Sequence, residues 1–387
     1  MNKNKKVYLD YNATTPVDPL VQKAMNPYFN KRFGNTMSLH YWGQEAKIAL
    51  DESRQTIAKI IGAKSEEVIF TGSATESNNL AIKGVALANN PNDQKQIITT
   101  TIEHPSVIES MGWLKERGVE IAKVGVDSSG LVNSLEIEKA IKKETILVSI
   151  IHASNEIGVI QPIKEIGRLC RDRGVYFHID ATQTLGKLPI DVEEMNIDLL
   201  TASAHKIYGP KGVGLLFRRR GVKITPLLHG GGQEQKIRGG TVNTAGVVGF
   251  AKASEIAANL MEEENKRITQ LRDELIGEVL KIKGAYLNGH PQKRIATNAN
   301  FWFSFLEGES LAILLSLKGI AVSTGSACSS DKLQASPVLL AIGLNHSQAH
   351  GSLRVSLGRW TTREEINYFI KALIQSINQL RKTSPLK

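Results

Sequence analysis

Polar and charged side chains gather where two predicted strands of this sequence end. Asp180 and Gln183 close the first strand, and Lys206 closes the second. Ligands of open α/β sheets bind at the carboxyl ends of strands. An acid and a lysine there suit pyridoxal 5'-phosphate (PLP), because lysine holds it as a Schiff base and the acid pairs with the protonated pyridine nitrogen. Alternatively, the two residues are a helix cap and a surface charge.

A third polar segment has the composition of an anion site. Residues 71–79 read TGSATESNN and follow the apolar run Val68–Phe70. Hydroxyls and backbone N–H groups at the start of a helix bind anions, so this segment with Ser203 and His205 could hold one phosphate. The segment lacks the GxxxxGK(S/T) pattern of a nucleotide P-loop. The alternative is an ordinary helix capped by serine or threonine.

Two further residues could contact a ligand. His104 lies in TIEHPS at another strand end, where it could stack on a planar ring or move protons near neutral pH; alternatively, it caps the helix after Pro105. Arg354 lies in SLRVSLG, whose alternation predicts a half-buried strand. Its guanidinium fits the carboxylate of an amino acid, although a structural ion pair is an equal alternative.

The two cysteines differ in their surroundings. Cys328 lies in VSTGSACSSD, a Gly-containing polar stretch that predicts a mobile loop with an exposed, nucleophilic thiol. An incidental loop cysteine is the alternative. Cys170 lies in a helical pattern and is interpreted as a small buried or half-buried filler. Two cysteines cannot build a disulfide framework, and there is no CxxC pair for zinc.

Composition excludes several classes of protein. The 387 residues are 41% hydrophobic and 22% charged, which argues against disorder and collagen and suggests two or three domains of about 150 residues. The N-terminus has no secretory pattern, and no run of about 18 apolar residues could span a membrane. We therefore expect a cytoplasmic protein in a reducing compartment.

The chain is basic, with 48 Lys and Arg against 38 Asp and Glu, or a net charge of +10. Such a surface could attract nucleic acid, an anionic cofactor or an acidic protein. The positive residues are scattered, however, and the run Arg218–Arg220 is interpreted as a solvated turn. Nucleic-acid binding is therefore not the favoured interpretation.

Short β-rich runs alternate with helical patterns, which predicts an α/β domain with a mostly parallel sheet. The expected strands show little alternation, as in strands buried on both faces. They are residues 96–101, 146–153, 175–181, 199–204 and 212–218. Helices are expected at 106–117 and 163–173, each followed by a glycine in the position of a C-terminal cap, Gly118 and Gly174.

The pattern changes near residue 255. A long amphipathic helix at 251–282 precedes a strand at 298–304, a helix at 310–318 and a terminal helix that begins with the capping box Thr362–Glu365. We predict a large domain, 12–255, and a smaller α+β domain formed by 1–11 and 256–387. The Cys328 loop, about 322–336, belongs to the smaller domain.

Together these segments resemble the cysteine desulfurases of the NifS/IscS type, PLP-dependent enzymes of fold type I in the class V aminotransferase group. The matching segments run nearly from end to end and are YLDYNATTP (8–16), GSATESNN (72–79), EHP (103–105), NEIG (155–158), HIDATQ (178–183), SAHKIYGPKG (203–212), HGGGQE (229–234), RGGT (238–241), SAC (326–328) and RVSLGR (354–359). The resemblance implies a large domain whose mostly parallel sheet has seven strands flanked by helices.

The resemblance also implies a role for each matching residue. Lys206 would be the Schiff-base lysine and general base, Asp180 would bind the pyridine nitrogen, and Gln183 the ring hydroxyl. His104 would stack on the ring and assist proton transfer, and Cys328 would accept the sulfur. The remaining cofactor and substrate residues would be Ala74, Thr75, Ser203 and His205 on the phosphate, Thr241 on the phosphate of a neighbouring subunit, and Asn155 and Arg354 on the substrate carboxylate, with Asn155 also beside the cofactor.

The implied reaction removes sulfur from L-cysteine, releases L-alanine and leaves a persulfide on Cys328. A homodimer and a sulfur-acceptor protein are implied as partners, the acceptor being an iron–sulfur cluster scaffold or a tRNA-thiolation protein, with transient cluster contact through Cys328. No metal site and no membrane partner are expected. A selenocysteine lyase or another class V PLP enzyme is the nearest alternative, and a non-enzymatic sulfur-relay or nucleic-acid-binding role is a more distant one.

Overall fold

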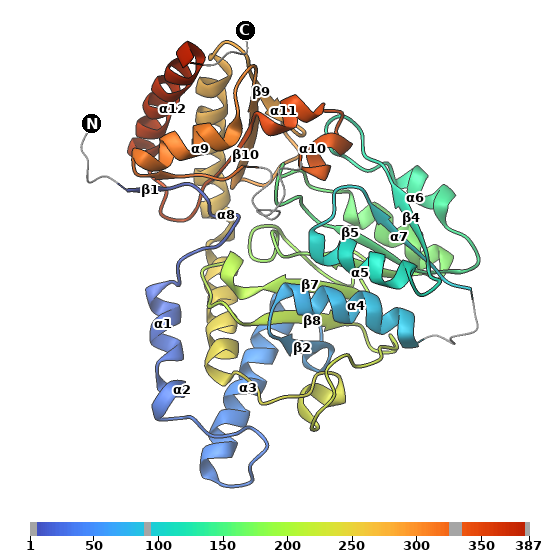
Figure 1. Ribbon diagram of the computed structural model, residues 1–387. Coiled ribbons are helices and arrows are strands. Elements are labelled where there is room, and N and C mark those ends of the chain that lie inside the picture. The colour runs from blue at the N-terminus through green and yellow to red at the C-terminus, as the bar shows by residue number, and fades with distance from the viewer. Residues whose placement is uncertain (1–5, 89–93, 325–334, 384–387) are drawn as a thin grey trace.

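A seven-stranded sheet forms the centre of the protein. The computed structural model describes residues 6–88, 94–324 and 335–383 (Figure 1). The strand order is β2-β8-β7-β6-β5-β3-β4, and all neighbours are parallel except that β8 is antiparallel to both β2 and β7. The strands are β2 Val68–Thr71, β3 Gln96–Thr100, β4 Glu120–Val124, β5 Thr145–Ile151, β6 Tyr176–Asp180, β7 Leu199–Ser203 and β8 Gly214–Arg218. The predicted mostly parallel α/β sheet is therefore confirmed.

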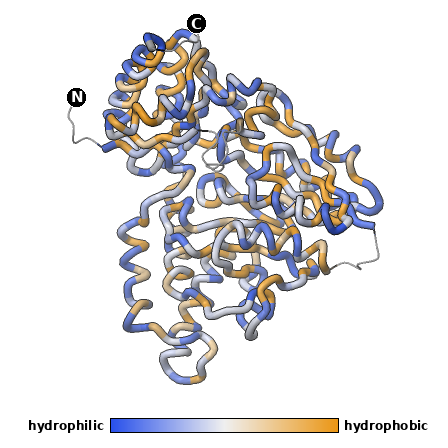
Figure 2. The backbone as a smooth tube through the Cα atoms, in the orientation of Figure 1, coloured by the Kyte–Doolittle hydropathy of each residue, from blue (hydrophilic) through white to orange (hydrophobic). Residues whose placement is uncertain are grey.

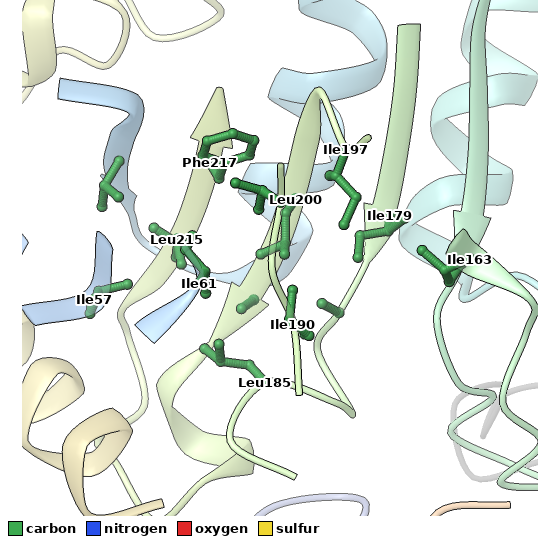
Figure 3. Packing of buried hydrophobic residues seen from close by; sticks show 14 of the residues in the cluster. Ile57, Ile61, Ile163, Ile179, Leu185, Ile190, Ile197, Leu200, Leu215 and Phe217 are labelled. Atoms are coloured by element: carbon green, nitrogen blue, oxygen red, sulfur yellow. The ribbon is translucent and has the colours of Figure 1, made fainter. Parts of the chain in front are cut away.

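Alternate residues of these strands enter two different hydrophobic cores, as the two-residue period of a strand requires. On one face Ile69, Ile97 and Leu216 pack against α4 Ala74–Ala88 and α5 Pro105–Lys115. On the other face, part of which is shown in Figure 3, Leu215 and Phe217 lie in the core that includes α3 Tyr41–Ile60, α7 Ile163–Arg173 and α8 Thr244–Leu280. Helices on both faces explain why the central strands read as continuous apolar runs.

The sequence did not predict β4, which lies at one edge of the sheet. Glu120 and Lys123 of this strand are exposed, and only Val124 is buried. An edge strand can carry polar residues because solvent reaches its free side, so its composition gives a weak signal.

The predicted helix 163–173 matches α7, which ends at Gly174 in the left-handed conformation with φ 67°.

The C-terminal part has its own core around a three-stranded antiparallel sheet of order β12-β10-β9. Figure 2 shows that hydrophobic and hydrophilic residues alternate along the helices of this part. This pattern is typical of amphipathic helices, which bury one face and expose the other. A short parallel pair, β1 with β11, brings the N-terminal segment to the same core. The bounds are β1 Val7–Tyr8, β9 Ala285–Asn288, β10 Asn298–Phe303, α9 Gly308–Leu317, β11 Ile320–Ala321, β12 Ser352–Ser356 and α12 Arg363–Thr383.

The helix α8 is continuous across the boundary predicted at residue 255. Its Val247 and Phe250 belong to the core of the large sheet, whereas Ile268 and Leu275 belong to the C-terminal core. The sequence predicted a start at 251, but the helix begins at Thr244, capped by the side chain of Asn243. The division into 12–255 and 256–387 with 1–11 stays a prediction. The remaining helices are α1 Pro19–Met25, α2 Pro27–Asn30, α6 Ser134–Ala140, α10 Pro337–Ala341 and α11 His346–His350.

Two local predictions have different outcomes. The capping box of the terminal helix is confirmed, because Thr362 N donates to Glu365 Oε2 at 2.9 Å and Glu365 N donates to Thr362 Oγ1 at 3.2 Å. The solvated turn at 218–220 is wrong for Arg219. Its guanidinium pairs with Glu193 at 2.5 Å and Asp198 at 3.3 Å, and it also donates to backbone carbonyls of the 192–197 segment.

Across the residues that the structure describes, no helix is both long and apolar enough to cross a bilayer. Within the same residues, no group of three or more His, Cys, Asp or Glu side chains is placed to bind a metal ion.

Two helix-interior glycines make a matched pair for a stability test. A Cβ at Gly167 in α7 would lie 2.0 Å from the carbonyl oxygen of Met195, whereas a Cβ at Gly112 in α5 would meet nothing within 4 Å. We expect Gly167→Ala to destabilise the fold by about 1–3 kcal/mol through overpacking. Gly112→Ala should stabilise it by about 0.5–1 kcal/mol, because alanine is the better helix former. Urea unfolding followed by circular dichroism checks both predictions, because the midpoint should fall in Gly167→Ala and rise in Gly112→Ala. An unchanged midpoint in Gly167→Ala would contradict the close packing of α7.

Candidate active site

A cavity of about 280 Å³ lies where the parallel strands of the large sheet end. Asp180 ends β6, Ile151 ends β5, and the segment after β7 supplies Lys206. This volume is near the lower end of the range for small-molecule sites, roughly 300–1,000 Å³. The cavity brings together most of the residues expected from the sequence, namely Ala74, Thr75, His104, Asn155, Asp180, Gln183, His205, Lys206 and Arg354.

The carboxylate of Asp180 is buried, with 3% of the residue exposed. Its Oδ2 accepts a hydrogen bond from Asn78 Nδ2 at 2.8 Å, and its Oδ1 accepts one from the backbone N–H of Thr182 at 3.0 Å. A buried carboxylate without such donors would be very costly. The two donors hold the carboxylate in place in the wall of the cavity, where it can accept a hydrogen bond from a protonated nitrogen of a ligand.

Lys206 is held by the N-terminal segment of the chain. Its Nζ donates to the carbonyl oxygens of Asn12 and Ala13, both at 2.6 Å. The same Asn12 oxygen accepts a hydrogen bond from Gln183 Nε2 at 3.0 Å. The amine and the Gln183 amide therefore lie side by side on one acceptor, facing the cavity.

A second lysine approaches Gln183 from the other end of its amide. Lys187 Nζ donates to Gln183 Oε1 at 3.4 Å. Burial and then the charge of Lys206 lower the pKa of Lys187 to about 7, although Glu264 opposes the shift. Because Gln183 Oε1 accepts from Lys187, the Nε2 end of the amide is the one turned towards Asn12 and the cavity.

His104 is the helix cap that the sequence offered as one interpretation, and it also lies in the wall of the cavity. Its Nδ1 accepts a hydrogen bond from the backbone N–H of Ser106 at 3.1 Å and so caps α5, while its ring lines the cavity. Burial lowers the pKa of His104; the charge of Asp180 opposes this shift and that of Lys206 adds to it. The imidazole is therefore neutral at pH 7, where it can still donate one proton.

The start of α4 has the properties of an anion site. The first-turn N–H groups of a helix have no acceptor within the helix, and the helix dipole favours negative charge there. Ala74 and Thr75, both in that turn, line the cavity. Ser73 Oγ accepts from Glu76 N at 3.1 Å and fixes the turn. His205, also in the wall, has its pKa lowered to about 4, first by burial and then by nearby lysines.

Arg354 lies in a fully buried strand, so the half-buried strand expected for it is wrong. The residue is 5% exposed, its Nη2 pairs with Asp10 at 2.9 Å, and its Nη1 donates to the carbonyl of Asn155 at 3.0 Å. Its Nε is buried and has no hydrogen-bond partner among the described residues. The structural ion pair therefore exists, and it uses two of the five N–H groups of the guanidinium, so that others, the Nε–H among them, remain for a ligand in the cavity that Arg354 lines.

Two expected site residues lie outside the lining of the cavity, and a third is not among the described residues. Ser203 is buried, and its Oγ donates to the carbonyl of Val213 at 3.3 Å, outside the lining of the cavity. Thr241 is exposed in the segment that precedes α8. Cys328 lies outside the described residues. Cys170 is buried in α7 as expected, and burial raises its thiol pKa to about 12, which leaves it protonated and unreactive.

The sequence reasoning missed several residues that complete the cavity. Asn78 follows Ala74 by one helical turn and therefore lies on the same face of α4, a spacing that could have revealed it. Ser106 follows His104 by two residues. Asn12 and Ala13 lie in the matching segment 8–16 but received no role, because only tertiary contacts such as Asn12 N to Ser356 Oγ at 2.9 Å bring them to the site.

Comparison with known proteins agrees with this geometry. The family model described as Aminotransferase class-V matches residues 7–369. The chain is 50% identical over 384 residues to "Cysteine desulfurase IscS" of Dictyoglomus turgidum, covering 99% of this chain and 97% of the relative. It is 49% identical to "Cysteine desulfurase IscS" of Methanosarcina thermophila, covering 99% and 95%.

Solved structures show the same similarity. A structure named "NIFS-LIKE PROTEIN" superimposes with a TM-score of 0.92 at 38% identity, covering 97% of this chain and 100% of the other. A second, "SspA in complex with cysteine", superimposes with a TM-score of 0.83 at 35% identity, covering 92% and 100%.

Proposed function

The chain belongs to the class-V aminotransferase family, among the cysteine desulfurases of the NifS/IscS type, and we propose that it uses PLP to convert L-cysteine into L-alanine and a persulfide on Cys328. The observation that carries this proposal is a single cavity that joins the Lys206 amine, the Asp180 carboxylate and the first turn of α4. The amine would bind the aldehyde carbon of PLP, the carboxylate would pair with its protonated ring nitrogen, and the first turn of the helix would bind its phosphate.

The walls of the cavity also fit such a cofactor. Asn78 Oδ1 and Thr182 Oγ1 are buried polar atoms without a partner in the described part of the chain, and both residues line the cavity. Buried polar groups are normally satisfied, so unpaired ones in a cavity wall point to a polar ligand. The His104 ring supplies an aromatic face beside them.

When bound, PLP supplies an electron sink for the negative charge that develops at the substrate Cα. Lys206 would hold the cofactor and would accept the Cα proton at Nζ. Asp180 would keep the ring nitrogen protonated, and Gln183 Nε2 would donate to the ring hydroxyl. The first-turn amides of Ala74 and Thr75, together with His205, would bind the phosphate, whereas Ser203, which lies outside the lining of the cavity, would support this region through its hydrogen bond to Val213.

The substrate carboxylate needs a cationic partner. We assign this role to Arg354, whose Nε has no hydrogen-bond partner among the described residues, with the side chain of Asn155 beside it. Because Asp10 and the Asn155 carbonyl occupy the two terminal nitrogens, the guanidinium is held rigidly. A fixed guanidinium orients the amino acid and loses little freedom when it binds.

Cys328 would accept the sulfur. Its thiolate forms an S–S bond with the substrate sulfur while the Cβ–S bond breaks, and the electron pair of the broken bond returns to the substrate carbon skeleton, which is protonated to alanine. The products balance without an external oxidant. The other cysteine of the chain is excluded from this role by burial and by its raised pKa of about 12.

A second copy of the chain is the proposed partner for an exposed apolar surface. Phe29, Phe33, Leu39 and Trp42 are 63%, 63%, 93% and 50% exposed, and they lie on and between α2 and α3, at the lower left of Figure 1. Monomeric proteins rarely expose such a patch. In a homodimer, the exposed Thr241 would reach the phosphate of the neighbouring subunit.

The persulfide would pass to an acceptor protein, either an iron–sulfur cluster scaffold or a tRNA-thiolation protein. The net charge of +10 favours an acidic acceptor. We assign the protein to the cytoplasm, because the Cys328 thiol must be regenerated in each cycle and a reducing compartment keeps thiols free.

Lys206→Ala tests the cofactor assignment. The variant should lose the visible absorption band of the covalently held cofactor, and turnover should fall by about 10²–10⁴-fold or more, because it lacks both the attachment point and the base. Lys164→Ala, at an exposed lysine of α7, is the control and should keep both. A Lys206→Ala protein that retains the band would mean that another lysine holds the cofactor.

Cys328→Ser separates cofactor chemistry from sulfur transfer. Wild-type protein given L-cysteine and a reductant should produce alanine and sulfide in equal amounts. Cys328→Ser should still bind PLP and show the spectral change on adding cysteine, but form almost no alanine. Cys170→Ala, which changes the only other cysteine, should behave as wild type. Normal alanine formation by Cys328→Ser would contradict the assignment of the nucleophile.

Leu39→Glu tests the dimer. Because Leu39 is 93% exposed, the substitution should leave the subunit folded but place a charge in the proposed interface. Sedimentation velocity should show twice the chain mass of 42.4 kDa for wild type and a shift towards the monomer for the variant. The control is Ile313→Glu on α9, where the side chain is 60% exposed in another part of the molecule. A monomeric wild type, or equal dissociation of both variants, would refute this interface.

A further inference from the structure

A continuous chain of hydrogen bonds links His104 to Asp180. His104 Nδ1 lies 2.8 Å from Ser106 Oγ, Asn78 Nδ2 donates to the same Ser106 Oγ at 2.8 Å, and Asn78 Nδ2 also donates to Asp180 Oδ2 at 2.8 Å. Asn78 and Ser106 are 0% and 8% exposed. The proposed function gives His104 and Asp180 separate roles, uses only the Oδ1 atom of Asn78 and gives Ser106 no role.

The direction of every hydrogen bond in this chain is fixed by chemistry. An amide nitrogen only donates, so both protons of Asn78 Nδ2 are used, one on Asp180 and one on Ser106 Oγ. The opposite orientation of the amide would place Asn78 Oδ1 against the Asp180 carboxylate, two acceptors in contact. The charge of Asp180 therefore determines the orientation of the Asn78 amide.

The same reasoning continues to the histidine. Since Ser106 Oγ accepts from Asn78, its own proton is the one available to the neighbouring acceptor, His104 Nδ1. That nitrogen also accepts the backbone N–H of Ser106 at 3.1 Å. Two donors directed at Nδ1 require a lone pair there, so the single proton of the neutral imidazole is on Nε2.

We propose that Asn78 and Ser106 are positioning residues that transmit the charge of Asp180 to His104 and hold its imidazole as the neutral tautomer protonated on Nε2. Nδ1 is occupied, so Nε2–H is the polar group of the ring that is left for a ligand in the cavity. His104 therefore presents a proton donor to that ligand. The proposal rests on the proposed function only for the step in which this proton is used.

The charges around His104 are compatible with this state. Burial lowers its pKa, Asp180 on β6 raises it, and Lys206 after β7 lowers it. Glu103, the preceding residue, is buried, and burial raises its pKa to about 8, so it is mostly uncharged at pH 7. The Ser106 hydroxyl acts in the same direction as burial, because it binds the lone pair that exists only in the neutral ring.

Ser106→Ala tests the chain of hydrogen bonds with a readout that does not depend on activity. Without the hydroxyl, the neutral imidazole loses one donor, so protonation becomes easier and the His104 pKa should rise by about 0.5–1 unit. Nitrogen-15 NMR of histidine-labelled full-length protein with PLP bound measures both tautomer and pKa, and His104→Gln assigns the signal. Wild type should show the Nε2–H tautomer and a pKa below the usual value of about 6.5.

Matched variants keep the test specific. Ser110 lies one turn further along α5, is also buried, and its hydroxyl donates to the carbonyl of Ser106 at 2.7 Å and not to His104, so Ser110→Ala should leave the His104 pKa unchanged. Ser106→Thr restores a hydroxyl and should return the pKa to the wild-type value. Asn78→Ala, which frees the Ser106 hydroxyl to rotate, should shift the pKa in the same direction as Ser106→Ala.

Three outcomes would overturn the proposal: an Nδ1–H tautomer in wild type, an unchanged His104 pKa in Ser106→Ala, or an equal shift in Ser110→Ala. Alanine formation is measured on the same samples. If wild type shows the expected tautomer but makes no alanine, the proposed function fails and the positioning role stands. If alanine forms normally and the tautomer is wrong, the reverse holds.

Discussion

The carboxylate of Asp180, buried at the carboxyl end of β6, is the constraint on which the rest of the site depends. A charge in such a place is tolerated only if donors surround it. One donor is the backbone of Thr182, which follows directly from the turn after β6. The other is Asn78, and it can reach Asp180 only because α4 begins beside the same edge of the sheet. The position of α4, whose first turn is the proposed anion site, is thus tied to the position of the acid.

The other side of the cavity depends on long-range packing. The N-terminal segment supplies the Asn12 carbonyl that accepts from both Lys206 and Gln183, and Asn12 is itself bound to Ser356 of β12. Arg354 in the same strand pairs with Asp10. The site is therefore complete only when the C-terminal core and the large sheet are assembled together, and the continuous helix α8, which enters both cores, provides a rigid connection between them.

A cluster of charged and aromatic side chains around Arg359 strengthens this connection. Arg359, after β12, pairs with Asp18 at 2.8 Å and with Glu264 of α8, and its guanidinium lies 4.4 Å from the centre of the Tyr208 ring. Tyr208 follows Lys206 by two residues and has a φ of 66°, an unusual value for a residue with a side chain. The cluster therefore holds the turn that presents Lys206 and joins it to the C-terminal core.

The sequence allowed the fold and much of the site to be predicted because both depend on local patterns. Asp180, Lys206 and His104 stand at strand ends, and strand ends can be read from apolar runs. Edge strand β4 was missed because solvent removes the need for apolar residues there. Arg354 was expected in a half-buried strand, because polar residues alternate with apolar ones there. The polar residues of this strand are nevertheless buried, because they pair with distant parts of the chain, as Arg354 does with Asp10. Asn12 could not be predicted for the same reason, since only tertiary structure brings its carbonyl to Lys206.

The protonation state of the cofactor ring nitrogen, for which Asp180 is the proposed partner, tests this account most directly. The measurement is the nitrogen-15 chemical shift of PLP labelled at its ring nitrogen and bound to the full-length protein. A protonated ring nitrogen that persists at neutral and mildly alkaline pH, and is lost in Asp180→Asn, is the predicted result. An unprotonated nitrogen in the wild type, or a protonated one that is unchanged in Asp180→Asn, would contradict the central role given to this buried carboxylate.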